Sequence, residues 1–349
     1  MLVTRQIPLK NERHPFFVDW LSIRQEHLHE LPHVCAGVVW EADAEGAVKW
    51  RTVKAKAIEG SYETSVQIRC DGQRVTFSGN VSRFCRTDNL FGFDFAQCLE
   101  IINEILASQG LPPFTTGEKF YRHVRTKDGL DLRSAWTGAV LTRIDLTANY
   151  ETGSLANARA YMEWLASQQG TARIKVGTHG DGETVDWGRG SRSSYAKAYL
   201  KSEELKRHGA PQKLIDHCEE VGLVRFEVTA KATWLHDHGC HYLGELDMHQ
   251  LELLFEDRAT VLTRAKHTVD DLAELPNTLR RTARDYLAGD DVAARMSEAT
   301  FRRHRKGLLS FGIDIAVRRN VIDFKPRVRT IEVRPARVPS WYDFARKAA

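Results

Sequence analysis

Three segments of the chain alternate polar and apolar residues with a period of two. They cover residues 143–149, 195–201 and 224–231. Successive side chains of a β-strand point to opposite faces, so this period predicts strands. Antiparallel strands with one face on a core and the other toward water alternate in this way, whereas buried parallel strands are apolar throughout. We therefore expect an α+β fold, with a mainly antiparallel sheet and helices packed on its apolar face.

The first 243 residues contain two cycles of strands and helices that resemble each other in order. Each cycle opens with a strand that carries an internal aspartate, Asp19 in the first and Asp145 in the second. An ancient duplication would produce this pattern, and two unrelated halves are the alternative. Strands are predicted at residues 16–23, 34–40, 48–57, 65–70, 74–78, 139–150, 172–178, 184–187, 195–201 and 223–234, and helices at residues 95–109, 155–168 and 211–220.

From about residue 244 the chain changes to a helical pattern. Ser297 is well suited to cap the last helix. We expect a catalytic α+β domain at residues 1–243 and a basic helical region at residues 244–349, for which a helix-turn-helix is one arrangement. Helices are predicted at residues 246–265, 269–275, 279–287, 291–296 and 298–311, a strand at residues 327–333 and an aromatic anchor at residues 338–342.

The composition is that of a soluble globular protein, with 42% hydrophobic and 28% charged residues. No apolar run approaches the length of a membrane span, and the first residues lack the apolar stretch and cleavage site of a secretory leader. We therefore expect a cytoplasmic protein with no membrane partner. The six cysteines are widely spaced and form no Cys-x-x-Cys pair, which predicts reduced and mostly buried thiols.

Basic residues are concentrated at the C-terminal end. The net charge is +4, yet residues 301–349 carry thirteen Lys and Arg against four Asp and Glu. Clustered cations release counterions when they bind a polyanion, so DNA is the expected partner. A solvated tail that favours solubility is the alternative. The cations of the predicted last helix are Arg302, Arg303, Arg305 and Lys306.

Two tyrosines lie among lysines in the strand predicted at residues 195–201. At strand period Tyr195, Lys197, Tyr199 and Lys201 share one face. At helical period Tyr195 and Tyr199 are four residues apart and also face the same way. Lysines can hold a phosphate and favour the phenolate, so this group suits attack by a phenol oxygen on a phosphodiester. The alternative is an exposed amphipathic strand with ordinary surface lysines.

The same sheet face would collect two carboxylates, Asp145 and Glu227. Carboxylate oxygens bind Mg²⁺ or Mn²⁺, and such an ion would polarise the scissile phosphate beside the phenol. A metal or a lysine is needed because a free tyrosine has a pKa of about 10. The alternative is a sheet face on which Arg and carboxylate side chains form ion pairs across the strands. The cations of this face that are expected to contact DNA are Arg143, Arg225 and Lys231.

Three histidines, His236, His238 and His241, form another group with metal-binding side chains. Many single-strand endonucleases hold their metal with two histidines on either side of a bulky apolar residue, but Asp237 stands between the first two here. A polar loop is therefore the preferred interpretation. Asp19 is a further candidate ligand, for which a structural role is preferred. No Gly-rich phosphate loop, Ser-His-Asp order or dinucleotide fingerprint is present, which argues against an ATP-driven enzyme.

Five stretches of the chain resemble the gene II/X replication initiators of filamentous bacteriophages and related plasmids. Each stretch is short, and the specificity comes from their common order from residue 87 to the C-terminus. They are TDNLFG at residues 87–92, LTRID at 141–145, TVDW at 184–187 running into AYLK at 198–201, LVRFE at 223–227 and PSWY at 339–342.

The resemblance implies a site-specific endonuclease and ligase that starts rolling-circle replication by nicking one strand of the supercoiled origin. The family's tyrosine becomes joined to the 5′ phosphate, which frees a 3′ hydroxyl for the host polymerase, with a host helicase as a further partner. The nucleophile aligns with Tyr199, and Asp145 and Glu227 lie in shared motifs. The family pattern does not require a tyrosine at the place of Tyr195, so alternating use of two tyrosines stays open.

Two other functions also stay open. A non-catalytic DNA-binding regulator, such as a repressor or a copy-number control protein, would use the tyrosine face only for backbone contacts. A nuclease whose metal activates water would leave no protein on the DNA and would not reseal a nick. Origin recognition is expected in the basic C-terminal region, with help from Arg83 and Arg86.

Overall fold

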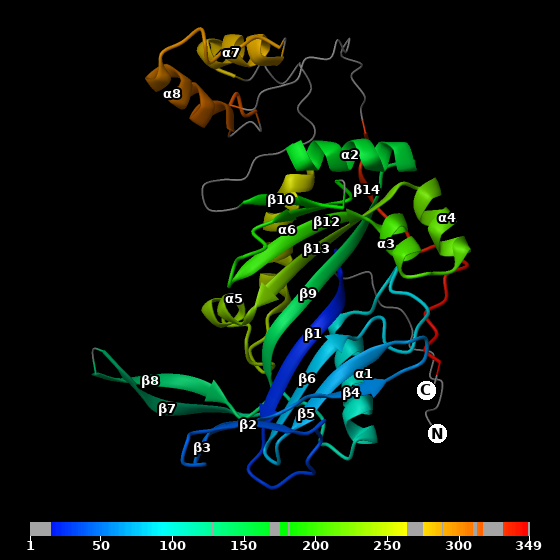
Figure 1. Cartoon of the computed structure of the whole chain (residues 1–349), viewed down its shortest axis with the longest axis vertical. Coiled ribbons are helices and arrows are strands. Elements are labelled where there is room, and N and C mark those ends of the chain that lie inside the picture. The colour runs from blue at the N-terminus through cyan, green and yellow to red at the C-terminus, as the bar shows by residue number, and fades with distance from the viewer. Residues whose placement is uncertain are drawn as a thin grey trace.

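One large antiparallel sheet organises the computed structural model of the chain (Figure 1). The structure describes residues 15–127, 129–167, 175–180, 182–263, 275–287, 289–309, 313–316 and 331–347. The strand order is β10-β11-β12-β13-β9-β1-β6-β5-β4, with β14 (Arg334–Pro335) paired to β9. The strands of the first half are β1 (Phe17–Glu26), β4 (Lys56–Glu59), β5 (Ser65–Cys70) and β6 (Arg74–Asn80). Those of the second half are β9 (Val140–Glu151), β10 (Val176–His179), β11 (Thr184–Trp187), β12 (Ser194–Leu200) and β13 (Leu223–Lys231).

The two halves of the sheet have the same strand order when followed outward from the centre. Their first strands, β1 and β9, pair with each other in the middle. Next to each lies the last strand of its own half, β6 or β13, and the earlier strands follow toward the edges. A duplication would produce this arrangement, and it agrees with the two cycles expected from the sequence.

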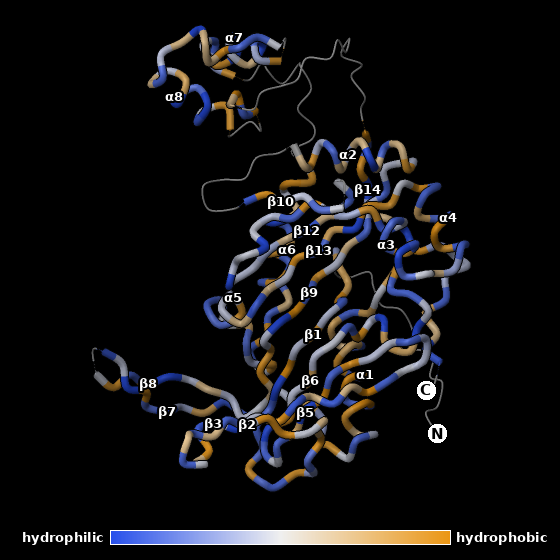
Figure 2. The backbone as a smooth tube through the Cα atoms, viewed as in Figure 1, coloured by the Kyte–Doolittle hydropathy of each residue, from blue (hydrophilic) through white to orange (hydrophobic). Residues whose placement is uncertain are grey.

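Helices of both halves pack on the apolar face of the sheet. They are α1 (Phe95–Ser108), α2 (Leu155–Ser167), α5 (Ala232–Asp237) and α6 (Met248–Thr263). The Phe255 ring of α6, for example, lies 5.7 Å from the Phe226 ring of β13. Residues of α1, α2 and α6 join those of the strands in one hydrophobic core. Figure 2 shows the apolar positions of the central strands in orange.

Helix α1 illustrates how the sequence sets these elements. The Asp94 side chain accepts a hydrogen bond from the Gln97 backbone, and the Gln97 side chain accepts one from the Asp94 backbone. This reciprocal capping satisfies two amides that the helix cannot pair. Gly110, with φ +70°, follows the helix and reverses the chain at low conformational cost.

Two short helices, α3 (Lys201–Arg207) and α4 (Gln212–Glu220), lie at one end of the opposite, polar face. Their apolar residues form a second small core with the loop between β6 and α1 and with Leu223 of β13. The α+β class and the antiparallel sheet predicted from the sequence are therefore confirmed. The expected coverage of one face by helices holds for the larger helices, while α3 and α4 cover part of the other face.

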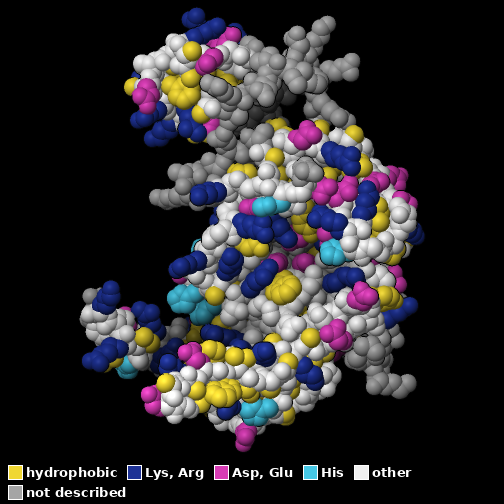
Figure 3. Space-filling view, viewed as in Figure 1, with side chains coloured by type: hydrophobic (Ala, Val, Ile, Leu, Met, Phe, Trp, Pro, Cys, Tyr) yellow, Lys and Arg dark blue, Asp and Glu magenta, His cyan; other side chains and the backbone are white. Residues whose placement is uncertain are grey.

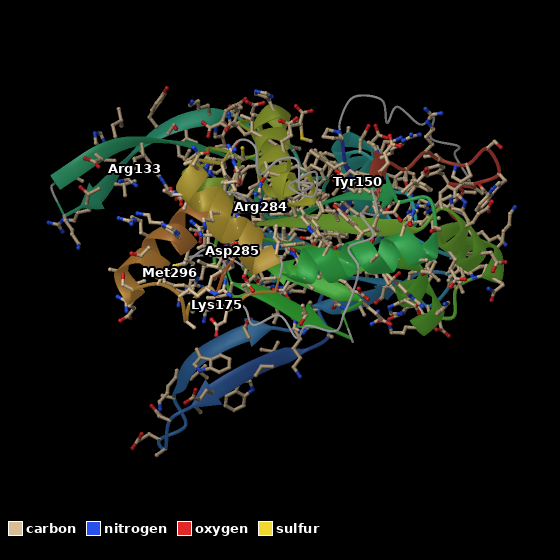
Figure 4. All side chains as sticks on the ribbon, turned by 90° about the horizontal axis from the view of Figure 1, so that it is seen from above. Arg133, Tyr150, Lys175, Arg284, Asp285 and Met296 are labelled. Atoms are coloured by element: carbon tan, nitrogen blue, oxygen red, sulfur yellow. The ribbon has the colours of Figure 1, made fainter. Side chains whose placement is uncertain are left out.

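Two β-ribbons stand outside the main sheet. One is formed by β2 (Val38–Ala42) and β3 (Val48–Val53), the other by β7 (Lys119–Thr126) and β8 (Gly129–Trp136). Both project from the same end of the molecule in Figure 1, and the view from above in Figure 4 shows them diverging. The first ribbon overlaps two predicted strands, but the second was not predicted.

Near the C-terminus, α7 (Asn277–Leu287) and α8 (Glu298–Leu309) pack around a separate small core that includes Tyr286 and Leu308. The connection of residues 288–297 is longer than the turn of about 3–4 residues in a helix-turn-helix. The helix predicted at residues 291–296 is wrong, because residues 292–295 form a turn. The helix predicted at residues 269–275 lies outside the described residues, except for Leu275.

Other differences from the sequence prediction are local. The strand predicted at residues 223–234 ends at Lys231, and α5 follows directly. Of the strand predicted at residues 327–333, residues 327–330 lie outside the described part and residues 331–333 are not a strand. The domain boundary at residue 243 stays a prediction, and α6 packs in the core of the sheet beyond it.

The described residues include no helix long and apolar enough to cross a membrane. All six cysteines are free thiols, and five of them are buried, with Cys35 partly exposed. The expectation that the cysteines are mostly buried is therefore confirmed.

Candidate active site

The polar face of the second half brings the predicted site residues into neighbouring cross-strand rows. Tyr199 of β12 lies opposite Arg225 of β13, and Lys197 lies opposite Glu227. A third row joins Tyr195, Thr229 and Asp145 across β12, β13 and β9. Figure 3 shows this face of the molecule, with Lys and Arg side chains in dark blue over β9, β12 and β13. The common face predicted from the alternating pattern is present for these residues.

Tyr199, Glu227 and Lys197 are in direct contact. The phenol oxygen of Tyr199 donates a hydrogen bond to Glu227 Oε1 at 2.5 Å, and Lys197 Nζ lies 2.7 Å from Glu227 Oε2. Lys197 Nζ also lies 5.1 Å from the centre of the Tyr199 ring. One carboxylate thus joins a phenol and an ammonium group.

Burial and the charge of Glu227 raise the pKa of Tyr199 well above its ordinary value of 10. Burial opposes ionisation of Glu227, but Lys197 and Arg225 outweigh it, and the pKa of Glu227 falls below 4.5. At neutral pH the phenol is therefore protonated and its partner is a carboxylate. The lysines do not favour a phenolate here, contrary to the sequence interpretation; the geometry instead provides a base beside a neutral phenol.

Asp145 is held by Arg143 through two hydrogen bonds, of 2.9 Å to Oδ1 and 2.6 Å to Oδ2. The guanidinium also lies 5.0 Å from the centre of the Trp20 ring. The Asp145 side chain is 7% exposed and that of Arg143 36% exposed. Burial raises the pKa of Asp145, and Arg143 opposes that rise. Arg143 thus neutralises a buried carboxylate while part of its surface faces solvent.

Arg225 is completely buried. Its guanidinium donates to Asn149 Oδ1 at 3.0 Å and to the backbone oxygens of Asn89 and Leu90 at 2.6 Å each. The prediction that Arg225 contacts DNA is therefore wrong for this arrangement. Its neighbours Asp19, Glu227 and Tyr199 favour its charged form, and it lowers the pKa of Glu227. Arg225 instead supplies a buried positive charge beside Tyr199 and Glu227, under the loop that carries Asn89 and Leu90.

Lys201 is also buried, since β12 ends at Leu200 and Lys201 begins α3. Its ammonium group donates to Asn89 Oδ1 at 2.8 Å and to Glu204 Oε2 at 2.6 Å. Burial and Arg225 lower its pKa. The sequence placed Lys201 on the exposed face with Tyr199; the structure corrects this, because the change from strand to helix turns it toward the loop that carries Asn89.

The loop between β6 and α1 covers this end of the polar face. Asp19 accepts hydrogen bonds from the amides of Asn80 and Asn89, each at 2.9 Å. Burial and Glu227 raise the pKa of Asp19, and Arg225 opposes the rise. Asp19 therefore has the structural role preferred from the sequence, since it fixes the loop whose carbonyls bind Arg225.

The C-terminal aromatic segment at residues 338–342 also contacts the loop between β6 and α1. The Tyr342 hydroxyl donates to Asp88 Oδ1 at 2.5 Å and accepts from the Phe91 backbone at 3.1 Å and from Arg86 at 2.8 Å. Arg86 is 2% exposed. The expectation that Arg86 contacts the origin is thus wrong for this arrangement, while the predicted aromatic anchor at residues 338–342 contributes Tyr342.

Asp145 and Glu227 are diagonal neighbours on adjacent strands, because Glu227 lies opposite Thr147 and Asp145 opposite Thr229. Diagonal side chains are about 7–8 Å apart and within reach of a shared ligand. Both carboxylates are buried and are of the type that Mg²⁺ and Mn²⁺ prefer. They fit a divalent ion chemically, provided that Arg143 and Lys197 move aside. The described residues contain no group of three or more His, Cys, Asp or Glu arranged to hold a metal.

The remaining predicted residues are near the site or far from it. Tyr195 stands opposite Thr229, with the ammonium group of Lys231 5.0 Å from its ring centre and 2.7 Å from the Ser191 carbonyl. Arg302, Arg303 and Lys306 are exposed on α8, and Arg305 is bound to Asp314 at 2.8 Å. Figure 1 shows α8 away from the sheet.

The three histidines do not converge on one point. His238 stacks on Trp234 with ring centres 4.1 Å apart, and His236 approaches Asp237 at 3.4 Å. His236 and His241 rings are 4.9 Å apart. The preferred interpretation of a polar loop holds for His238 and His241, but His236 belongs to helix α5, which covers residues 232–237.

Sequence reasoning missed two residues that complete the site. Asn89 contacts Asp19, Lys201 and Arg225 with its amide and carbonyl groups, and Asn149 orients Arg225. Asn89 lies in one of the five stretches that carry the resemblance, and Asn149 ends the alternating segment at residues 143–149. The sequence thus pointed to both asparagines, but their contacts depend on how the loop between β6 and α1 folds over the sheet.

Comparison with known sequences matches the chain to both parts of the family of the phage replication-associated protein, the gene II protein. Residues 17–252 match the N-terminal part of that family and residues 268–346 the C-terminal part. The replication-associated protein of Enterobacteria phage I2-2 is 28% identical over 354 residues, covering 93% of this chain and 96% of the relative. The protein of the same name from Escherichia phage If1 is 28% identical over 316 residues, covering 79% and 97%.

Among solved structures, "Structure of Rolling Circle Replication Initiator Protein from Geobacillus stearothermophilus" is similar over 62% of this chain and 74% of that chain. The sequence identity is 11% and the TM-score is 0.25, a similarity too low to relate the two folds.

Proposed function

The chain belongs to the family of the phage replication-associated protein, and from this membership we propose that it initiates rolling-circle DNA replication by nicking one strand of an origin and later resealing it. The contact that supports the proposal most strongly is the 2.5 Å hydrogen bond from the Tyr199 hydroxyl to Glu227. It pairs a nucleophile with a base on the polar face. In this proposal Tyr199 is the nucleophile and Glu227 is the general base.

In the nicking step the Tyr199 oxygen attacks the phosphorus of the scissile phosphodiester. Its proton passes to Glu227 Oε1, which already accepts its hydrogen bond. A bond forms between the phenol oxygen and phosphorus, and the bond from phosphorus to the 3′ oxygen breaks. The 3′ oxygen takes a proton and becomes the primer end for a polymerase. A general base must be unprotonated before it accepts a proton, and Lys197 and Arg225 lower the pKa of Glu227, so that it is a carboxylate at neutral pH.

Cations around the pair have distinct roles in the proposal. Lys197, whose side chain is 34% exposed, orients Glu227 and reaches the surface where a phosphate would lie. Arg143 and Lys231 contact the DNA backbone on the same face, and the buried Arg225 keeps Glu227 ionised. When Lys197 and Arg143 turn from these carboxylates toward the phosphate, Asp145 and Glu227 would hold a Mg²⁺ or Mn²⁺ ion, which would supply neutralisation of the phosphate charge.

Resealing reverses the same chemistry. A 3′ hydroxyl attacks the phosphotyrosine and releases its proton to water, the bond from phosphorus to the Tyr199 oxygen breaks, and the phenolate takes up a proton through Glu227. The phosphotyrosine keeps the energy of the original phosphodiester, so the reaction needs no ATP. This agrees with the lack of a nucleotide-binding motif in the sequence. Tyr195, beside Lys231, is the candidate for a second nucleophile in an alternating scheme.

The proposal assigns origin recognition to the basic helix α8, through its exposed cations Arg302, Arg303 and Lys306. Host polymerase and helicase would act on the nicked origin. The two relatives come from bacteriophages, so the proposed setting is the cytoplasm of a bacterial host.

The test is incubation with supercoiled DNA that carries the replication origin adjacent to the gene, in the presence of Mg²⁺, followed by a denaturing gel. We expect a nicked circle with protein linked to its 5′ end. Tyr199→Phe should lose the nick and the link, while Tyr195→Phe is the matched control that keeps both. A nick without linked protein would favour a nuclease that activates water, and binding without a nick would favour a regulator.

A further inference from the structure

The ribbon formed by β7 and β8 extends from the body with both of its faces open. Eight residue pairs form it, from Lys119 opposite Trp136 to Thr126 opposite Gly129. It is fixed at its base, where Lys119 lies 3.2 Å from Glu245 and 5.9 Å from the centre of the Trp136 ring. The buried residue of the ribbon, Ala135, also lies at the base. An isolated hairpin is only marginally stable in water, so a ribbon without a core of its own suggests a surface for a partner.

The ribbon is rich in cations and in exposed apolar side chains. Residues 119–136 carry five Lys and Arg against two Asp and Glu. Tyr121, Leu130 and Leu132 are 65%, 70% and 61% exposed and lie on one face. Large apolar side chains that remain this exposed indicate a surface that contacts a partner.

Arg122 and Arg133 lie directly opposite each other on the other face of the ribbon. Like charges in opposed positions destabilise a sheet, and a bound anion relieves that repulsion. Asp131 approaches Arg133 at 3.5 Å, with both side chains more than half exposed, so solvent weakens this pair. Figure 4 labels Arg133 on the ribbon as it extends from the body.

The other ribbon, β2 and β3, has a similar shape and a different charge. Residues 38–53 carry two Lys and Arg against three Asp and Glu. Trp50 donates to Glu41 at 2.6 Å, and Lys49 lies 3.8 Å from the same carboxylate. Its cations are partly neutralised within the ribbon. The positive balance is thus a property of β7 and β8 and not of projecting ribbons in general.

We propose that the ribbon of β7 and β8 is an arm that binds duplex DNA by entering the major groove beside the nick. This inference rests on the proposed function. The major groove admits a two-stranded β-ribbon, and its thymine methyl groups accept apolar contacts such as those of Leu130 and Leu132. Arg122, Arg125 and Arg133 would contact the flanking phosphates.

The position of the arm fits a duplex that runs across the polar face. The arm leads directly into β9, which begins at Val140 and carries Arg143 and Asp145. A strand of eight residues spans about 26 Å. This length is somewhat less than one turn of DNA, which is about 34–36 Å. The arm would therefore cover most of one turn on one side of the nick.

The experiment compares wild type with Arg122→Ala/Arg133→Ala, and uses Lys49→Ala/Arg51→Ala on the other ribbon as the matched control. Binding to a short fluorescent duplex from the origin is measured by anisotropy over a range of salt concentrations. For the arm variant we expect an affinity about tenfold lower and a salt slope reduced by about 1.8, since each lost phosphate contact removes about 0.9. The control should match wild type.

Each protein is also tested for covalent linkage to a single-stranded oligonucleotide that spans the nick, which needs Tyr199 but not the arm. Linkage by all three proteins, with weaker duplex binding by the arm variant alone, supports the arm. Equal duplex affinity and salt slope for wild type and the arm variant would overturn it. If wild type forms no linkage, the proposed function fails, and the duplex binding data still decide whether the ribbon contacts DNA.

A crosslinking measurement decides the identity of the partner without removing any cation. Leu130 is replaced by benzoylphenylalanine, and the full chain is irradiated with the same duplex. Crosslinks to DNA near the nick support the proposal. Crosslinks only between two copies of the chain would overturn it and make the arm a protein contact.

Discussion

The two halves of the sheet share a strand order but carry different chemistry on the polar face. In the first half Ser22 and Ser78 lie opposite each other, and their hydroxyls are 2.7 Å apart. In the second half the corresponding surface holds contacts between ionised groups, with Lys197 against Glu227 and Arg143 against Asp145. The comparison teaches that the strand arrangement provides a surface and that a few charged residues distinguish the half that carries the proposed active site, called here the reactive half.

The first half contributes to the site indirectly. Asp19 of β1 and the loop after β6 bury Arg225 and Lys201, which lie in the second half. Tyr342 of the C-terminal segment closes the same loop. Buried cations of this kind require partners from several parts of the chain, because an unpaired buried charge is costly. The reactive half therefore depends on the other half for its electrostatics.

The strongest test of this comparison removes the proposed base. Glu227→Gln keeps the shape of the side chain but cannot take the proton from Tyr199, so the rate of covalent linkage should fall by about 10²–10⁴-fold. Single-turnover assays with an origin oligonucleotide measure it. Ser22→Ala/Ser78→Ala is the matched change in the first half and should leave that rate unchanged. Equal losses in both variants would contradict the division of roles.

Arg225→Met should destabilise the fold by about 3–5 kcal/mol, because it removes a buried charge that acts on Asp19 and Glu227 and leaves the Asn89 and Leu90 carbonyls without their donor. Urea unfolding measures the loss. Arg74→Met, which removes an exposed ion pair with Glu26, should cost about 1 kcal/mol or less. If the two variants were equally stable, Arg225 would not hold the halves together as we infer.

Tyr342→Phe tests the contact between the C-terminal segment and the loop. It leaves Asp88 and the Phe91 amide without their partner, which should cost about 1–3 kcal/mol. Tyr121→Phe, on the exposed ribbon, should change stability by less than about 0.5 kcal/mol. Thermal unfolding compares them. A Tyr342→Phe variant as stable as Tyr121→Phe would show that the loop holds without this hydroxyl.

The rate of covalent linkage should also depend on pH through Glu227, and this effect should be smaller than those of the substitutions above. Glu227 is the acceptor of the phenol proton only when ionised, and its pKa lies below 4.5. The linkage rate should therefore lose the contribution of this base only when the pH falls below that value. Lys197→Met removes a charge that lowers the pKa of Glu227, so the fall should begin at a higher pH. An identical pH profile for wild type and Lys197→Met would contradict this coupling.

The lowered pKa of Glu227 also contributes to the stability of the folded protein, in a direction that depends on pH. A carboxyl whose pKa is lowered by folding stabilises the folded state above its unfolded pKa and loses that contribution as the pH falls through the folded value. Glu227 should thus help to stabilise the protein at neutral pH and cease to do so in acid.

Much of the fold follows from local patterns in the sequence. β5 and β11 occupy the residues predicted for them, and the alternating pattern correctly placed Tyr199, Glu227 and Asp145 on one face. These features depend on residues close in the chain. The burial of Arg225 and Lys201 could not be predicted in the same way, because it depends on a loop more than one hundred residues earlier. A cation that is exposed by its strand position can be covered by such a loop.

The ribbon of β7 and β8 was missed for a different reason. Exposure on both faces removes the regular alternation by which a half-buried strand is recognised, and Phe120 and Leu130 occur on opposite faces. The helix predicted at residues 291–296 failed because Asp291 caps a turn through the Ala294 amide instead.

The most direct measurement is to map the residue that becomes linked to DNA. After reaction with a single-stranded origin oligonucleotide, the protein is digested and the peptide carrying nucleotide is sequenced by mass spectrometry. The account predicts a phosphodiester on Tyr199, the phenol in contact with Glu227 in the reactive half. Linkage only to Tyr195, or to any tyrosine of the first half, would contradict it.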